Sequence, residues 1–250
     1  MNPMIADNTP TFLPAGECAL VVEFGTTIDP AINAEVLALD RGLQAAAIAG
    51  VIETVPTYRS LLVHYDPMLI TPRALEGRIG AIDRGAFRGT ETPASWTLPV
   101  CYDEPFGEDI PYVASTLGLS PERVIALHAG ATYRLYMYGF APGFAYLGGL
   151  ASELSISRRT EPRARIEPNK LIIAGGQAIV TTVAMPAAWH ILGETPEELF
   201  NPRRAPMFLL SVGDLLRFEM ESAGAALPSH KRVLGYDVWF EPLPRTTTGK

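Results

Sequence analysis

The chain has 250 residues, of which 48% are hydrophobic and 19% charged, so it can bury a sizeable core and wholesale disorder is disfavoured. A formal net charge of −7 argues against nucleic-acid binding as the main role, because that role requires a basic face. Two distant cysteines, Cys18 and Cys101, have no CxxC or metal-ligand spacing, and we expect buried free thiols in a reducing compartment.

The sequence gives no indication of a membrane or a secretory route. Residues 1–12 lack the basic and apolar regions of a signal peptide, and the longest weakly polar run, 43–52, is too short to span a bilayer. We therefore expect a cytoplasmic protein without a membrane partner.

The first third of the chain alternates between strand and helix patterns. The expected elements, in chain order, are a strand at 18–24, a helix at 30–47, strands at 50–58 and 60–66, and a helix from Thr71. Asp29-Pro30 opens the first helix as an N-cap followed by proline. The order β-α-β-β-α predicts a ferredoxin-like unit, and residues 96–102 are a candidate for its last strand.

A small, polar segment with glycine and proline, residues 88–95, is interpreted as a linker. We place a small α/β domain at 12–92 and a compact β-barrel or sandwich at 93–245, which is an α+β arrangement overall. The expected elements of the second half are helices at 109–117 and 121–128, a helical turn at 195–200, and strands at 133–140, 170–176, 178–184, 207–214 and 215–220.

The sequence contains no standard catalytic signature. It lacks a Walker-type phosphate loop, a GxSxG elbow, an HExxH motif and an EF-hand loop, and its four histidines are scattered. We therefore expect no metal site, and no catalytic residue is identified.

The stretch YMYGFAPGFAYLGGL, residues 136–150, gathers glycine, proline and aromatic residues. Pro142-Gly143 is typical of the centre of a type II turn, because proline fixes φ and glycine accepts a positive one. Such a turn can point backbone N–H groups outward as an anion-binding concavity, which Phe140 and Phe144 would wall. The alternative is a tight barrel corner with core aromatic residues, and the stretch alone does not decide between them.

A basic segment follows at 157–170, where five basic residues stand against two acidic ones. Arginine recognises carboxylates in a bidentate manner, so Arg158, Arg159 and Arg163 are candidates for the counter-charge of a small anionic substrate. A solvated, charged loop is the alternative. Proximity to the glycine-proline turn favours the pocket.

Three further side chains are candidates for the pocket or for a structural role. Trp189 is either a pocket wall or a core residue, and Gln177 is a candidate amide donor after a Gly-Gly corner. His128 ends a predicted helix, where a cation that suits the helix dipole is favoured over a catalytic base.

Taken in chain order, these motifs resemble a known family. YRLYMYGFAPGFAYLGGL, RRTEPRARIEP, IAGGQA, PAAWHILGET and GDLLRF resemble the B subunit of 5-oxoprolinase and the kinase inhibitor KipI, whose domain is also called allophanate hydrolase subunit 1 or carboxyltransferase domain. GECALVVEFG and VPTYRSLLVHYDP fit the same family, and the resemblance covers about residues 12–242. It implies a small α/β domain followed by a cyclophilin-like β-barrel. The positions that match the family's patterns, and that it implies for the pocket, are Tyr138, Phe140, Pro142, Gly143, Phe144, Arg159, Arg163, Gln177, Trp189 and Asp214.

The resemblance also implies an activity. The chain is expected to belong to an ATP-dependent 5-oxoprolinase complex that opens a small carboxylate-bearing cyclic amide, 5-oxoproline, to glutamate. ATP is then the cofactor of the complex, and the partners are its KipA-like C subunit and its A subunit. Two alternatives are a binding module that inhibits a sensor histidine kinase, and a carboxyltransferase or allophanate hydrolase component of urea metabolism.

The sequence departs from the family's patterns at five places. They are Ser157, residues 169–171, Thr181-Thr182, Ala187-Ala188 and Glu194. All five lie in the second half of the chain, so another lactam or amide substrate is a further alternative.

Overall fold

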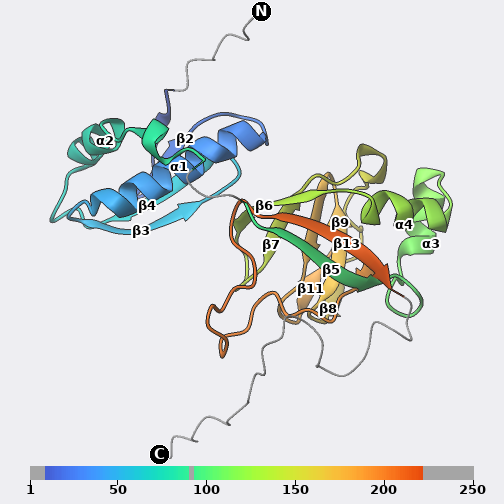
Figure 1. The fold of residues 1–250 in the computed structure, drawn as a ribbon. Helices are drawn as coiled ribbons and strands as arrows, with labels where there is room; N and C mark the ends of the chain where they lie inside the picture. Colours follow the sequence, from blue (N-terminus) through green and yellow to red (C-terminus); the bar gives the residue numbers. More distant parts are fainter. Residues whose placement is uncertain (1–8, 90–92, 222–250) are drawn as a thin grey trace, which may run out of the picture.

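The computed structural model describes residues 9–89 and 93–221. Within these ranges, a four-stranded sheet and a closed barrel form two separate units (Figure 1). Each of the two has a hydrophobic core of its own. The predicted domain limits, 12–92 and 93–245, stay predictions, because residues 90–92 and 222–245 lie outside the described ranges. No helix within those ranges is both long and apolar enough to cross a bilayer.

The N-terminal sheet has antiparallel strands in the order β1-β2-β4-β3. Their bounds are Thr11–Pro14 for β1, Ala19–Glu23 for β2, Val51–Pro56 for β3 and Ser60–Tyr65 for β4. Helices α1 (Pro30–Ala46) and α2 (Pro72–Gly80) lie over one face of this sheet, and the 3-10 helix η1 (Arg84–Phe87) packs beside α1 (Figure 1).

The ferredoxin-like order is confirmed from β2 to α2, but the candidate for its last strand is wrong. Residues 95–101 form β5 in the barrel, and the edge position beside β2 is taken by β1. Ala15 donates its N–H to the carbonyl oxygen of Ala19 at 2.9 Å and closes a tight turn between β1 and β2. Pairing across so short a turn closes a much smaller loop than a return of the chain from beyond α2, so its entropic cost is lower.

The second sheet closes into a barrel in the order β10-β7-β6-β13-β5-β12-β9. Neighbouring strands are antiparallel except β5 and β13, which run parallel. The bounds are Ser95–Cys101 for β5, Tyr133–Tyr138 for β6, Ala145–Gly148 for β7, Lys170–Ala174 for β9, Gln177–Val180 for β10, His190–Glu194 for β12 and Leu215–Glu221 for β13.

Three smaller units surround the barrel. Helices α3 (Ile110–Leu117) and α4 (Pro121–Ala129) lie together beside it (Figure 1). The 3-10 helix η2 (Ser152–Leu154) follows β7 and contacts α4. Strands β8 (Arg163–Ile166) and β11 (Met185–Ala187) form a two-stranded sheet that is not part of the barrel.

Alternate residues of the barrel strands point to opposite sides of the wall. Leu171 and Ile173 of β9 join the core inside the barrel, whereas Ile172 belongs to a second apolar cluster on the outside. Ile179 of β10 and Ile191 of β12 share that outer cluster, which includes residues of both β8 and β11. The wall therefore carries a second apolar layer outside the barrel.

Two predicted elements of the second half do not form. Residues 195–200 are not helical, because Thr195 Oγ1 accepts the N–H of Glu197 at 3.2 Å and the chain continues to an isolated bridge between Phe200 and Phe208. Residues 207–214 are turns around that bridge rather than a strand. A capping box without a longer helical pattern is too short to overcome the cost of helix nucleation.

Two side-chain expectations are wrong. Both cysteines are free, but Cys18 is exposed and only Cys101 is buried.

His128 is fully buried, with its ring stacked on Phe218 at 5.0 Å and Nδ1 2.8 Å from the Tyr102 hydroxyl. Burial lowers the pKa of His128 to about 3, so it is neutral at pH 7 and not a helix-terminal cation.

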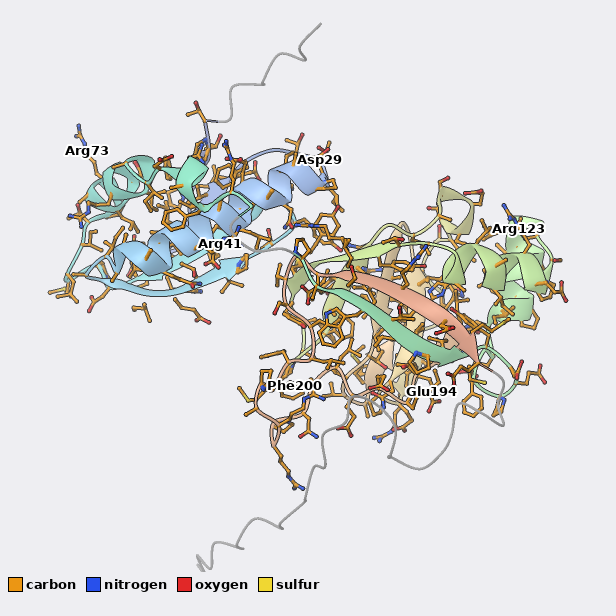
Figure 2. All side chains as sticks on the ribbon, in the orientation of Figure 1. Asp29, Arg41, Arg73, Arg123, Glu194 and Phe200 are labelled. Atoms are coloured by element: carbon orange, nitrogen blue, oxygen red, sulfur yellow. The ribbon has the colours of Figure 1, made fainter. Side chains whose placement is uncertain are left out.

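The N-terminal unit touches the barrel through the start of α1. Figure 2 shows Asp29, whose Oδ1 caps α1, at the end of the helix nearest the barrel. One turn further, buried Asn33 donates from Nδ2 to the carbonyl oxygens of Thr57 at 3.1 Å and Tyr136 at 3.3 Å. Its Oδ1 accepts from Arg134 Nε at 3.4 Å. One amide thus joins the β3–β4 turn to β6.

Candidate functional site

A cavity of about 240 Å³ lies outside the barrel wall, between the β8–β11 sheet and the loop 139–144. It is smaller than the ~300–1,000 Å³ pockets that hold drug-sized ligands, so it suits a small molecule. Among the described residues that line it, Arg158 is the one charged side chain. Its main walls are Phe140, Phe144, Tyr146, Ile172 and Trp189, and residues 185–188 complete the lining.

The loop beside the cavity contains the predicted turn. Gly143 has φ of 70°, and Phe144 donates its N–H to the carbonyl oxygen of Ala141 at 3.1 Å, which matches a type II turn with Pro142 before the glycine. A Cβ on Gly143 would lie 2.2 Å from Cβ of Phe200, so the loop packs tightly against the following segment.

Part of the backbone in this loop, where an anion-binding concavity is predicted, is hydrogen-bonded within the loop itself. Ala141 donates its N–H to the carbonyl oxygen of Gly139 at 2.8 Å, and the Phe144 N–H is used in the type II turn. Phe140, between them, has φ of 66° and forms the centre of a tight turn that is rare and strained for a bulky residue. The N–H groups of Ala141 and Phe144 are therefore not available to an anion, and the concavity stays a prediction.

Two of the three candidate arginines are bonded to a buried carboxylate. Asp109, 4% exposed, accepts from Arg163 Nη1 and Nη2 at 2.8 Å each and from Arg159 Nη1 at 3.0 Å. It also accepts the N–H of Ile191 at 2.7 Å. Burial alone would raise the pKa of Asp109, but the bonds from Arg163 and the Ile191 N–H outweigh it and hold the pKa below its usual value.

Arg158 is the arginine that faces the cavity. Its Cζ lies 5.8 Å from the ring centroid of Trp189, which forms a wall and is 9% exposed. Within residues 9–89 and 93–221, no carboxylate pairs with Arg158. Arg165, by contrast, is exposed and bonded to Glu167 at 2.7 Å. Arg158 is therefore available to an anion.

Backbone contacts on either side hold Arg158 in this place. His190 Nε2 donates to the carbonyl oxygen of Ser157 at 2.9 Å, and Arg159 donates its N–H to the carbonyl oxygen of Ala188 at 2.7 Å. These bonds tie the two neighbours of Arg158 to the two neighbours of Trp189. The guanidinium and the indole therefore form one unit.

The remaining candidates lie outside the cavity lining. Asp214 is buried and accepts from Trp96 Nε1 at 2.9 Å and from the N–H of Ala94 at 3.0 Å, so it ties the starts of β5 and β13 together. Tyr138 donates its hydroxyl to the carbonyl oxygen of Leu210 at 2.8 Å. Gln177 lies at the start of β10 on the outer side of the wall and is described below.

Sequence reasoning missed Asp109, Tyr146 and Tyr58. Asp109 lies 50 positions from Arg159, so no local pattern linked the two. Tyr146 belongs to the quoted aromatic stretch, and its alternation with core residues in β7 was the available signal that it points outward. Tyr58 comes from the N-terminal unit and reaches the barrel only in three dimensions.

The departures from the family's patterns fall into two groups. Lys170 and Glu194 pair with each other across the neighbouring strands β9 and β12, with Nζ 2.5 Å from Oε2, and Figure 2 marks Glu194 at the end of β12. Thr181 is buried and accepts the N–H of Lys170 at 2.9 Å. Only Ala187 and Ala188 line the cavity itself, so these two bear on the ligand.

The part of the chain that the structure describes holds no group of three or more His, Cys, Asp or Glu side chains that could bind a metal ion. The described lining of the cavity instead consists of aromatic and aliphatic side chains and one guanidinium. It can hold a small, flat, singly charged anion, with its charge on Arg158 and its ring against the aromatic walls.

Comparison with known proteins assigns the chain to a family. The profile described as carboxyltransferase domain, subdomain C and D, matches residues 10–210. The chain belongs to this family. The B subunit of 5-oxoprolinase from Bacillus subtilis (strain 168) is 34% identical over 214 residues, which cover 81% of this chain and 89% of the relative. That of Escherichia coli O157:H7 is 32% identical over 215 residues, 84% and 95% of the two chains.

Several solved structures are similar to this chain in fold. TTHA0988 is 33% identical with a TM-score of 0.74 over 84% of this chain, which spans only 41% of that longer chain. PH0987 from Pyrococcus horikoshii is 33% identical with a TM-score of 0.53 over 87% of this chain and 100% of its own. Urea amidolyase of K. lactis, at 17% identity and a TM-score of 0.72 over 90% of this chain and 16% of its own, shares the fold alone. The expected α+β architecture is confirmed.

Proposed function

We propose that this chain is the substrate-binding component of an ATP-dependent complex that opens a small carboxylate-bearing cyclic amide, with 5-oxoproline opened to glutamate as the leading reaction. The observation that carries this proposal is Arg158, a cation without a carboxylate partner in the described part of the chain, on the wall of a small aromatic cavity. The names of the curated relatives support the reaction class.

The cavity suits the chemistry of such a substrate. A five-membered lactam is flat enough to lie against Phe144 and Trp189, and its single carboxylate matches the single guanidinium. An arginine–carboxylate bond is charge-assisted, and its strength rises where aromatic walls exclude water. Arg159 and Arg163 have a structural role in this proposal, because both pair with Asp109 and neither contacts the ligand.

The same cavity does not fit a nucleoside triphosphate. It is small, and its described lining offers one cation for a ligand that carries several negative charges. We therefore assign ATP to the other members of the complex, the KipA-like C subunit and the A subunit. In this proposal the chain contributes recognition and placement of the cyclic amide.

The test is turnover by the reconstituted complex. We expect co-expression with the A and C subunits to give ATP-dependent release of glutamate from 5-oxoproline. Arg158→Ala should raise KM about tenfold or more, because a hydrogen bond to a charged group contributes about 1.5–3 kcal/mol. Arg165→Ala is the matched control on the same segment, because Arg165 is exposed and paired with Glu167.

Two results would count against the proposal. The proposed reaction is wrong if the complete complex shows no ATP-dependent turnover of any pyroglutamate-like compound. If Arg158→Ala and Arg165→Ala have equal KM values, the cavity is not the substrate site.

A second candidate is a regulatory module that binds a sensor histidine kinase. Phe140 favours it, since this side chain is 75% exposed on the barrel half and Met207 in the same half is 48% exposed. A pull-down against the kinases of the host tests this role, and retention of a kinase by wild type but not by Phe140→Ser would favour it over the enzyme component.

A further inference from the structure

A tyrosine of the N-terminal unit reaches the outer wall of the barrel. Tyr58 lies in the turn between β3 and β4, and its hydroxyl accepts a hydrogen bond from Gln177 Nε2 at 2.7 Å. Its ring centroid lies 5.1 Å from that of Tyr136 and 6.3 Å from that of Tyr146, the latter edge to face. Tyr146 lines the cavity, so Tyr58 packs directly against a residue of the cavity wall.

Gln177 faces the same side of the wall as the cavity. It is two residues before Ile179 on β10 and opposite Ala174 of β9, and both of these belong to the outer apolar cluster. Because side chains alternate along a strand, Gln177 also points outward. Tyr58 and Gln177 therefore extend the row of groups that begins at Arg158 and Tyr146.

Tyr146 links the two ends of this row. Tyr146 and Arg158 line the same cavity, and the Tyr146 ring also packs edge to face on Tyr58. Burial raises the pKa of the Tyr146 hydroxyl, and the positive charge of Arg158 opposes that rise. Burial likewise raises the pKa of Tyr58, with Gln177 opposing and Tyr146 adding to the rise. A ligand held at Arg158 can thus extend along Tyr146 toward the Tyr58–Gln177 pair.

The pair has unused hydrogen-bonding capacity. Gln177 uses one N–H, which leaves its Oε1 as an acceptor, and Tyr58 accepts that bond, which leaves its O–H as a donor. Within the described ranges neither side chain has a second hydrogen-bond partner. The Tyr58 hydroxyl is protonated at neutral pH, and burial raises its pKa further above the ordinary value of about 10. An acceptor and a donor therefore stand side by side.

This arrangement is complementary to a lactam, whose ring places one N–H donor beside one C=O acceptor. We propose that Tyr58 and Gln177 are the specificity-determining residues for the amide of the ring, with Gln177 Oε1 accepting its N–H and the Tyr58 hydroxyl donating to its C=O. The inference rests on the proposed function, which supplies the cyclic amide. It adds that the ligand is recognised by both structural units at once.

Binding of three probes to the purified full chain tests the inference. The probes are 5-oxoproline, the γ-lactone of the same size with oxygen in place of N–H, and the saturated ether ring carboxylate, which has neither N–H nor C=O. We expect wild type to prefer the lactam over the lactone about tenfold in Kd by calorimetry, and the lactone over the ether ring by a similar factor.

The variants separate the two contacts. Gln177→Leu should bring the lactam-to-lactone ratio close to one while the lactone binds as before. Tyr58→Phe should weaken lactam and lactone together and leave the ether ring unchanged. Tyr136→Phe is the matched control, because its ring packs on Tyr58 without a bond to Gln177. A purely structural role for Tyr58 would weaken all three probes equally.

The outcomes distinguish this inference from the proposed function. An unchanged lactam-to-lactone ratio in Gln177→Leu, or a wild-type ratio near one, overturns the amide contact even when Arg158→Ala weakens all three probes. If Arg158→Ala binds them as wild type does, the carboxylate site is overturned. Failure of wild type to bind the lactam overturns both.

Discussion

Replacement of Asp109 by alanine tests whether Arg159 and Arg163 are structural residues. The change removes the acceptor of both guanidinium groups and of the Ile191 N–H. Loss of one partner from a buried ion pair costs about 3–5 kcal/mol. The two arginine side chains are 28% and 21% exposed, and Glu108 lies 3.5 Å from Arg163, so water and this neighbour recover part of the loss. We expect a decrease of about 2–4 kcal/mol in the free energy of unfolding.

Urea denaturation followed by circular dichroism at neutral pH measures this loss. Glu108→Ala is the control, because this carboxylate is 49% exposed and next in sequence to Asp109. Its removal should cost less than about 1 kcal/mol. If Asp109→Ala is no more destabilising than Glu108→Ala, the account of the two arginines as structural is refuted.

The same carboxylate gives a pH dependence with a definite sign. The folded pKa of Asp109 lies below its unfolded value, so its contribution to stability is present above the unfolded pKa of about 3.9 and is lost as pH falls through the folded pKa. Asp109→Asn should remove this part of the acid destabilisation. An acid-unfolding curve of the same shape for wild type and Asp109→Asn would contradict the assignment.

Two further predictions concern the glycine-proline loop and the buried histidine. Gly143→Ala should lower the free energy of unfolding by about 2–4 kcal/mol, because alanine is strained at this positive φ and its Cβ would contact Cβ of Phe200. Gly175→Ala is the control, since Gly175 has φ of 57° but open space around it, so only the φ strain applies. Equal losses of unfolding free energy for the two variants in urea denaturation would exclude the contact with Phe200. His128 has a folded pKa of about 3, below its unfolded value of about 6.5, so between pH ~6.5 and pH ~3 stability should fall by up to about 1.4 kcal/mol for each pH unit. In His128→Phe the free energy of unfolding should depend less steeply on pH over this range. An unchanged dependence would mean that another group takes up the proton on unfolding.

Features that depend on neighbouring residues were predictable. Asp29-Pro30 predicts the start of α1, and Asp29 accepts the Ala31 N–H at 2.7 Å there. Pro142-Gly143 predicts the turn that the loop adopts, because φ preferences belong to single residues. The alternating strand patterns likewise predict β2, β4 and β6 closely.

Features that depend on competition between distant segments were not predictable. The pattern of β5 is compatible with either sheet, and pairing with β13 and β12 decides for the barrel. The loop 139–144 shows the same limit, because the N–H groups of Gly139, Ala141 and Phe144 bond to carbonyl oxygens within the loop once it folds. A residue's bonding partners are set by distance in space, which periodicity does not encode.

The arginines of the basic segment 157–170 show most clearly which features follow from local sequence and which from tertiary structure. The order of residues is enough to show that several arginines follow an aromatic, glycine-rich loop, and that the chain resembles the B subunit of an enzyme complex. Which arginine faces a ligand was decided only by tertiary structure, because Asp109 of the distant α3 region bonds Arg159 and Arg163 and leaves Arg158 over Trp189. A guanidinium takes the carboxylate that the fold brings within 3 Å, whatever its distance along the chain.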